Sequence, residues 1–417
     1  MAIMANTIKE IRKNEGKENV LLLDAGDTFG DDQLANITRG AAIIQMMKLL
    51  EYDFMALGNH DFDYGRQRTK ELQTLAGFAF GGANIIDKET GKTFLDHPFL
   101  IKEISGIKLG IIALGYHNSL LTGNKANMQG LNFVPGDKVL KKHLPLLSAK
   151  TDIIIILSHQ GTAVDRITAK KFDDIDLIIG GHSHDIISGP EKINGTYLVQ
   201  ALSDAAVIGE VKLHLHNHKL QYAHAKSHLL WTDKHQADSK MQSLITSLRK
   251  PHLEELEEKI TVAKETIGRQ YKSESPCEKL IGNLLREHFN AEIAFLPGVG
   301  YGISLNGTVT SEDIYRLLPH PSKIVRLNLT GKQIKSILEQ TDTNQKPGEK
   351  QEVVGGLLQS SGISYMLDYS QPSGNRIGEV KVNGKGLELH KKYKIVTHSG
   401  MLNGLHRYDV FQRGKKY

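Results

Sequence analysis

The chain has 417 residues, too many for one ordinary hydrophobic core, so two domains are expected. Its net charge is +5, from 52 basic and 47 acidic residues, and it contains no dense run of lysine and arginine. Nucleic acid is therefore not an expected partner. The single Cys277 excludes an intrachain disulfide framework, and no apolar stretch is long enough to predict a membrane span.

The first residues predict an amphipathic helix, because Ile3, Ile8 and Ile11 lie on or near one helical face. They do not have the cationic start and apolar run of a signal peptide. A domain that opens abruptly on a helix suggests a fragment of a longer gene product, and we expect an upstream segment on this ground.

From residue 20 to about 228, short apolar runs alternate with helical segments. Apolar runs of four to six residues are typical of strands buried on both faces of a sheet. The alternation therefore predicts an α/β layered sandwich over residues 1–228. The expected strands lie within 20–27, 53–61, 78–84, 107–115, 152–161, 176–184 and 196–201, and the expected helices at 39–51, 66–76, 136–149 and 163–172.

The remainder of the chain differs in composition. Residues 229–266 are charged and helical in pattern, with Pro251 as an interruption. We interpret them as linker helices, and a helix packed on either domain is the equal alternative. Residues 267–417 mix helical and strand patterns, which predicts a smaller α+β domain. Its expected helices lie near 279–290 and 332–340, and its strands within 323–330, 362–369, 377–384 and 391–400.

Polar side chains follow four of the apolar runs at the points where the strands should end. In sheets covered by helices, the carboxyl ends of strands are where ligand sites form. Asp, Asn and imidazole are ligands for borderline divalent metals, and the neighbouring glycines allow tight turns. One such residue alone is usually a turn residue or a satisfied polar group, but the four together predict a metal site. They are Asp27, then Asn59 with His60, then His159, and finally His182 with His184.

The motifs "GDTF", "GNHDFDYG", "LSHQG" and "GGHSH" resemble those of the calcineurin-like metallophosphatases. Their order, followed by a second domain, resembles the 5′-nucleotidase family, including bifunctional 5′-nucleotidase and 2′,3′-cyclic phosphodiesterase proteins. The resemblance implies a four-layer α/β/β/α sandwich followed by an α+β substrate-binding domain. It also implies a hydrolase with divalent metal ions: Mn, Zn, Fe, Co or Mg.

The resemblance assigns a role to each motif residue. Asp27 would bridge two ions and His184 would serve the first of them. Asn59, His159 and His182 would complete the site of the second. His60 would be the catalytic histidine, and Asp61 would be the carboxylate that orients it.

The sequence departs from the family pattern at both ends. The family begins with a strand that ends in Asp-x-His and supplies two ligands of the first metal, and residues 1–23 contain no such motif. We therefore expect one ion to be held well, and the chain as it stands to be weakly active or inactive. Genuine loss of the motif is the alternative to a fragment. Residues 404–417 likewise resemble a region shortly before the family's end.

The substrate domain matches the family less closely. Tyr408 aligns with an aromatic residue that stacks on a nucleotide base in the family, and we expect it to bind substrate. The stretch "FLPGVGYG" (295–302) stands where the family has a loop with Asn and Arg, and it has neither. The other aromatic position falls in "LPHPSKI" (318–324), which has no aromatic residue.

The expected function is hydrolysis of nucleotide phosphoesters by metal-activated water, as a 5′-nucleotidase, a 2′,3′-cyclic nucleotide phosphodiesterase or both, in nucleotide catabolism. Two alternatives stay open. One is a non-catalytic protein that binds a phosphorylated ligand, and the other is a sulfur-ester hydrolase on the same scaffold. A small-molecule phosphoester is thus the expected partner. The location would be periplasmic or at the cell surface if the protein is exported, as is common in the family.

Overall fold

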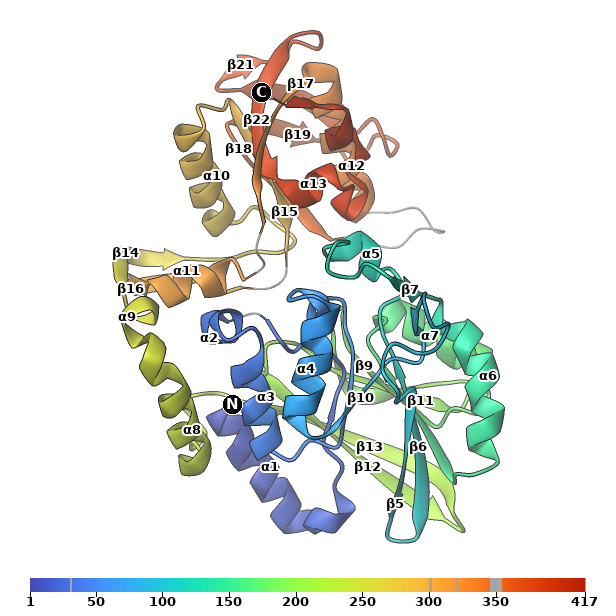
Figure 1. Ribbon diagram of the computed structural model, residues 1–417. Helices are drawn as coiled ribbons and strands as arrows, with labels where there is room; N and C mark the ends of the chain where they lie inside the picture. Colours follow the sequence, from blue (N-terminus) through green and yellow to red (C-terminus); the bar gives the residue numbers. More distant parts are fainter. Residues whose placement is uncertain (31, 300–301, 320–321, 346–354, 417) are drawn as a thin grey trace. The chain divides into compact units, whose positions relative to one another are not determined.

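The computed structural model describes residues 1–30, 32–299, 302–319, 322–345 and 355–416. They form two compact units, Met1–Leu253 and Glu254–Tyr417. Figure 1 shows both units as mixtures of helices and strands. No helix in these described ranges is long and apolar enough to cross a bilayer.

The first unit is built on two main sheets and a long hairpin. The smaller sheet has the order β1-β2-β3 and is parallel, and the larger has the order β10-β11-β9-β8-β6-β5. Its strands are β1 (Leu23–Asp24), β2 (Phe54–Ala56), β3 (Ala79–Gly81), β4 (Ile85–Asp87), β5 (Phe99–Ile104), β6 (Ile107–Leu114), β7 (Leu131–Phe133), β8 (Ile153–Ser158), β9 (Leu177–Gly180), β10 (Ile186–Ile193), β11 (Thr196–Ala201), β12 (Val207–His216) and β13 (Lys219–Leu229).

Helices cover the outer faces of the two sheets, which makes four layers (Figure 1). Ile44 and Leu72 from the helices on one side pack with Phe80 of the smaller sheet, whereas Leu140 packs against the larger sheet. Phe54 fills the space between the sheets. The helices are α1 (Ala2–Glu15), α2 (Gln33–Ile37), α3 (Ala41–Leu49), α4 (Arg66–Ala76), α5 (Ser119–Thr122), α6 (Gly136–Ser148), α7 (Thr162–Lys171) and α8 (Ser239–Arg249).

The register of the larger sheet brings several strand ends to one edge. Leu114 of β6 pairs with Ser158 of β8, and Ser158 pairs in turn with Gly180 of β9. These strands are parallel and consist almost entirely of buried apolar residues, as expected for strands covered on both faces. The residues that follow each strand therefore emerge side by side.

The predicted layered α/β fold of this unit is confirmed, although the compact unit extends to Leu253, beyond the predicted bound at residue 228. Each of the seven predicted apolar runs contains a strand, and α4 and β11 have the predicted bounds. The strands are shorter than the runs, however. In 20–27 only Leu23 and Asp24 form ladder pairs, because the polar end of the run turns away into a loop.

The second unit has three sheets: a five-stranded sheet of order β18-β15-β22-β17-β23, a three-stranded sheet of order β19-β20-β21 and the pair β14-β16. Its strands are β14 (Lys259–Ile267), β15 (Ile293–Gly298), β16 (Leu305–Thr310), β17 (Ile324–Thr330), β18 (Gly356–Ser361), β19 (Ile363–Leu367), β20 (Ile377–Val382), β21 (Lys385–Gly386), β22 (Lys392–His398) and β23 (Lys415–Lys416). Its helices are α10 (Pro276–His288), α11 (Ser311–Leu317), α12 (Gly331–Gln345) and α13 (Ser399–Leu402).

The predicted linker helices over 229–266 are only partly right. α8 and the short α9 (Leu253–Leu256) lie within this range, but Lys259–Ile267 form strand β14. Thr261 and Val262 pair with β16, and β-branched residues of this kind favour an extended backbone over a helix. The two units divide between Leu253 and Glu254, inside the predicted linker.

Candidate metal centre

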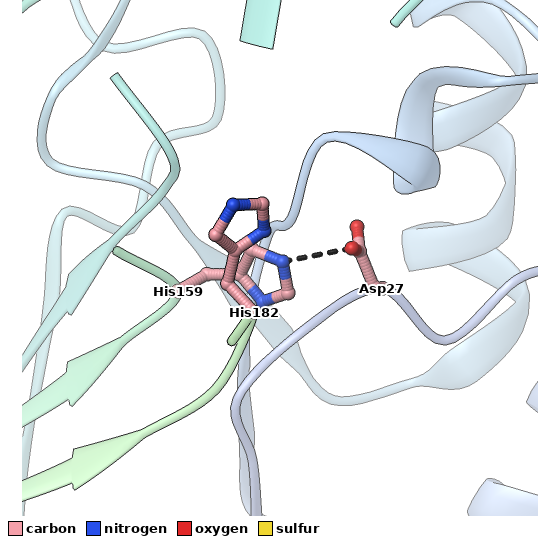
Figure 2. Close-up of side chains that lie close together, drawn as sticks. All are labelled: Asp27, His159 and His182. Atoms are coloured by element: carbon pink, nitrogen blue, oxygen red, sulfur yellow. Dashed lines mark ion pairs between the residues drawn. The ribbon is translucent and has the colours of Figure 1, made fainter. Parts of the chain in front are cut away.

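Three predicted ligands meet at the edge where the strands end. Asp27 lies three residues after β1, His159 directly after β8 and His182 two residues after β9. One potential ligand atom from each lies within 4.8 Å of the other two. Figure 2 shows the two imidazoles on one side of the cluster, with the Asp27 carboxylate facing them. Such a set of one carboxylate and two imidazoles suits a borderline divalent metal.

His159 is oriented as metal-binding histidines usually are. Its Nδ1 lies 2.7 Å from the Ala25 carbonyl oxygen, which can only accept, so Nδ1 carries a proton. In the neutral ring, Nε2 then presents a lone pair. Nε2 lies 2.8 Å from Asp27 Oδ2, but the two atoms are not aligned as a hydrogen bond. This separation is close to the roughly 3 Å between neighbouring ligands that share one ion with bonds of about 2.1 Å.

The Asp27 carboxylate is held from two directions. Its Oδ1 accepts the backbone N–H of His60 at 2.6 Å, while Oδ2 faces His159. Burial would raise the pKa of Asp27, but His159 and His60 oppose this and hold the pKa well below its usual range. Conversely, burial would lower the pKa of His159, whereas Asp27 raises it above the ordinary value. Asp27 and His159 thus face each other where a cation would bind.

Asn59 provides an independent indication of a ligand. Its side chain is only 2% exposed, and its buried Oδ1 has no hydrogen-bond partner among the described residues. A buried amide oxygen without a donor costs about 1–3 kcal/mol, so such atoms are rare in folded proteins. A bound cation would satisfy this oxygen. The donor set of Asp27, Asn59, His159 and His182 therefore fits a divalent metal ion.

Three of the site residues have backbone conformations that side-chain-bearing residues rarely adopt. The φ angles are 62° at Asp27, 73° at His182 and 54° at His184. Backbone strain of this kind clusters at functional sites. Gly58 is required at its position, because a Cβ there would collide with the Asp27 carboxylate.

His182 and His184 are both partly buried, and they differ in their place at the site. Burial lowers the pKa of His182 to about 3, so its ring is neutral at physiological pH and able to bind a metal. Burial also lowers the pKa of His184. The side chain of His184 is not part of the three-residue convergence.

The carboxylate that contacts the candidate catalytic histidine is Asp63. His60 Nδ1 lies 2.8 Å from Asp63 Oδ2. The prediction that Asp61 orients His60 is therefore corrected. His60 begins the single turn His60–Phe62, and residues three apart on such a turn lie on one face, whereas adjacent residues point in different directions.

Asp61 has another task. Its carboxylate accepts the backbone N–H groups of Gly58 at 2.7 Å, Asp27 at 2.8 Å and Thr28 at 2.8 Å, and that of Phe29 at 3.3 Å. The side chain is 1% exposed. Burial and the nearby Asp27 carboxylate raise the pKa of Asp61 to about 7, and the backbone donors oppose this rise. The four hydrogen bonds tie the loop of Asp27 to the loop of Asn59. Asp61 thus joins two segments that carry ligands.

Two family models match the two parts of the chain. Residues 2–185 match the family model of the calcineurin-like phosphoesterases, and residues 255–413 match that of the 5′-nucleotidase C-terminal domain. The chain belongs to the 5′-nucleotidase family of metallophosphatases. This family consists of hydrolases that use divalent metals.

Relatives from distant organisms share this architecture. The trifunctional nucleotide phosphoesterase protein YfkN of Bacillus subtilis is 27% identical over 97% of this chain, which spans only 31% of that protein's length. The 5′-nucleotidase of Rattus norvegicus is 26% identical over 97% of this chain and 77% of its own.

Solved structures give the same fold. A 5′-nucleotidase precursor from Thermus thermophilus superposes with a TM-score of 0.86 at 25% identity, over 100% of this chain and 86% of that one. The sulfate thiohydrolase SoxB of the same organism superposes with a TM-score of 0.88 at 23% identity, over 100% of this chain and 76% of the SoxB chain. At this identity the likeness to SoxB concerns the fold alone.

The expected substrate residue of this 5′-nucleotidase-type chain lies in a core. Tyr408 is 1% exposed, packs with Phe411, and its hydroxyl lies 3.0 Å from Thr341 Oγ1. The structure thus corrects the expectation that its ring stacks on a base, because no face of the ring is accessible. In the two loops that depart from the family pattern, residues 300–301 and 320–321 lie outside the described residues.

Two residues at the 5′-nucleotidase-type site were missed from the sequence. Asp63 follows His60 by three positions in "NHDFD", which is the spacing that predicts a shared face on a helical turn. Tyr116 follows β6 in "IIALGYHN", at the same sheet edge as His159, and its ring stacks on His182. The signal for Asp63 was its spacing from His60, and the signal for Tyr116 was its place just after an apolar run.

Proposed function

We propose that this chain is a metal-dependent phosphoester hydrolase that acts on nucleotides, as a 5′-nucleotidase or a 2′,3′-cyclic nucleotide phosphodiesterase. The observation that carries the proposal is the convergence of Asp27, His159 and His182 beside the unpartnered amide oxygen of Asn59. The 5′-nucleotidases and nucleotide phosphoesterases among its relatives favour nucleotides as the substrates.

The ligand roles follow from the donor atoms. Asp27, Asn59, His159 and His182 would hold one ion, and His184 would serve a second that shares Asp27. Divalent ions in such sites neutralise charge on the phosphoryl group and make water a nucleophile near neutral pH. Asn59 contributes a neutral oxygen, so the ion keeps a higher positive charge than it would beside a second carboxylate.

His60 is the candidate proton donor. Its Nδ1 is directed to Asp63 by the 2.8 Å contact, so the carboxylate fixes the ring orientation and stabilises the protonated form. A proton is then exchanged at Nε2. At a phosphoester, His60 would stabilise charge on the phosphoryl oxygens or protonate the leaving oxygen.

A substrate panel tests the proposal directly. The purified chain would be loaded with Mn²⁺, Zn²⁺, Co²⁺ or Mg²⁺ and assayed for phosphate release from 5′-nucleotides and for ring opening of 2′,3′-cyclic nucleotides. Asp27→Asn is the matched control, because it keeps the shape of the side chain and removes its charge. We expect turnover that requires metal, that is weak because only Asp27 and His184 remain for one of the two ions, and that this variant abolishes.

Other outcomes would point to the other functions. Release of sulfate from a thiosulfate or sulfate ester, with no phosphate release, would favour a sulfur-ester hydrolase. Tight nucleotide binding without turnover in every metal would favour a binding protein, and either result would contradict the proposal. If the protein is exported, as the family resemblance implies, its place of action would be the periplasm or the cell surface.

A further inference from the structure

The two candidate histidine ligands are positioned by different means. His159 donates Nδ1–H to the Ala25 carbonyl oxygen at 2.7 Å, which fixes its ring. No side-chain hydrogen bond to a described residue fixes the ring of His182. Metal-binding histidines normally have such a bond to hold the ring in place. Something else must therefore orient His182.

An aromatic ring lies directly against His182. The centroid of the Tyr116 ring is 3.8 Å from that of His182, and the ring planes are inclined by 31°. The His159 ring lies 5.1 Å from His182 at an inclination of 60°. Contact with two flat neighbours limits rotation of the imidazole about its Cβ–Cγ bond.

Tyr116 is attached to a fixed part of the backbone. The N–H and carbonyl of the preceding Gly115 both bond to the side chain of Asn84 at 2.8 Å, and Asn84 is 0% exposed. The carbonyl of Tyr116 accepts a hydrogen bond from the Ser119 hydroxyl at 2.6 Å. The ring therefore projects from a braced turn, which suits it to hold another side chain.

The same segment also reaches the turn that carries His60. The side-chain amide of Asn127 donates to the Asp63 carbonyl at 2.6 Å, and the Arg66 N–H donates to the Asn127 carbonyl at 3.0 Å. Residues 115–127 thus contact a candidate metal ligand at one end and the turn of the candidate acid at the other.

We propose that Tyr116 is a positioning residue that orients the metal ligand His182 through the face of its ring. The proposal rests on the metal site of the proposed function. Tyr116 acts through His182 and needs no contact with the substrate. Since the ring face carries the effect, a Phe at position 116 should still orient His182, whereas Ala or Leu should not.

Titration of the metal-free full chain with Mn²⁺ tests this without a substrate. The six-line electron paramagnetic resonance signal of unbound Mn²⁺ gives the Kd. Loss of groups that orient a metal ligand typically weakens binding by about 10- to 100-fold, and we expect this for Tyr116→Ala and Tyr116→Leu. Tyr116→Phe should bind as the wild type does.

The control is Tyr222→Ala. The Tyr222 ring also stacks on a histidine, His214, at 4.1 Å and 14°, but on the β12–β13 hairpin. We expect this variant to keep the wild-type Kd, which would separate the effect at the site from general loss of a Tyr–His stack. Circular dichroism of each metal-free variant shows whether it is folded. If Tyr116→Ala does not fold, the Kd of Tyr116→Leu decides the test.

Two results would overturn the proposal: wild-type Mn²⁺ affinity in Tyr116→Leu, or a loss in Tyr116→Phe as large as in Tyr116→Leu. A wild-type chain that binds no Mn²⁺ would remove its basis as well. Failure of the proposed hydrolase activity would look different, as a metal-loaded chain that turns over no nucleotide while the variants still differ in Kd.

Discussion

The two units of the molecule treat their motif residues in opposite ways. In the first unit, the motif side chains lie at strand ends and leave potential ligand atoms unpartnered, as at Asn59 Oδ1. In the second unit, the motif residue Tyr408 is buried and its hydroxyl has a partner in Thr341. A matching residue type is thus informative only where the backbone leaves its side chain something to bind.

A similar contrast exists inside one motif. Asp61 and Asp63 are two residues apart, and the first ties loops together while the second contacts His60. One carboxylate therefore serves the fold and the other serves the chemistry. The following predictions test both contrasts, beginning with the largest expected effect.

His60→Ala should lower kcat by about 10²- to 10⁴-fold, because it removes a general acid, and should leave the metal content unchanged. Turnover of a nucleotide and metal analysis of the same preparation would check this. His159→Ala is the comparison variant, in which metal should be lost together with activity. If His60→Ala also lost its metal, His60 would be a ligand.

Asp61→Asn should change the stability of the protein, whereas Asp63→Asn should change the pH dependence of its activity. An amide has one acceptor oxygen and one NH₂ donor. Some of the four backbone N–H groups that bond to residue 61 would therefore lose their acceptor. We expect the free energy of unfolding to fall by about 3 kcal/mol or more in Asp61→Asn. Asp63→Asn should unfold like the wild type and show an altered pH profile of kcat.

Urea unfolding and pH–rate profiles of the two variants give the answer. An Asp61→Asn protein of wild-type stability would contradict its assignment as the residue that joins the loops. An unchanged pH profile in Asp63→Asn would show that the contact with His60 Nδ1 has no part in the reaction.

The second unit should lose stability in acid. Burial lowers the pKa of His398 and of His406 to about 4, below the ordinary 6.5. As pH falls from 6.5 towards 4, the unfolded chain takes up protons that the folded unit does not, so folding becomes less favourable. Each pKa unit corresponds to about 1.4 kcal/mol, so the loss should amount to several kcal/mol.

Hydrogen exchange, corrected for the intrinsic rate at each pH, can follow the peptides of this unit separately. Their protection should decrease from pH 7 to pH 4.5. The double variant His398→Asn/His406→Asn should show a weaker dependence on pH. Equal protection of the wild type at both pH values would contradict burial of the two neutral rings.

Tyr408→Phe should have the smallest effect. It removes the hydroxyl that contacts Thr341 and leaves the ring, so the free energy of unfolding should fall by about 1 kcal/mol. KM for nucleotides should not change. A clear rise in KM, measured beside Thr341→Val as a control for the same lost contact, would restore Tyr408 as a substrate residue.

The sequence was most informative where buried parallel strands dictate the layout. The run 153–157 is apolar throughout and is followed directly by polar Ser158 and His159, so both the strand and the position of His159 were predictable. The carboxyl ends of such strands meet at one edge, which is why ligands from distant positions could be grouped from the sequence alone.

The sequence failed where orientation depends on a local turn or on packing. Nothing in composition distinguishes Asp61 from Asp63; only the geometry of the turn His60–Phe62 does. Burial of Tyr408 depends on partners such as Phe411 and Thr341, which are contacts of the folded unit. Likewise, β14 had a charged pattern that suits a helix, and pairing with β16 decided against it.

The left-handed backbone at Asp27, His182 and His184 has a consequence for protein engineering. A designer who copied only these side chains onto an ordinary sheet would find them aimed elsewhere, since standard strand and helix geometry cannot present them in the same way. A transplant of the centre would have to carry the irregular turns as well, together with the glycines that admit them. The backbone of the loops is therefore as much a part of this centre as the identity of its side chains.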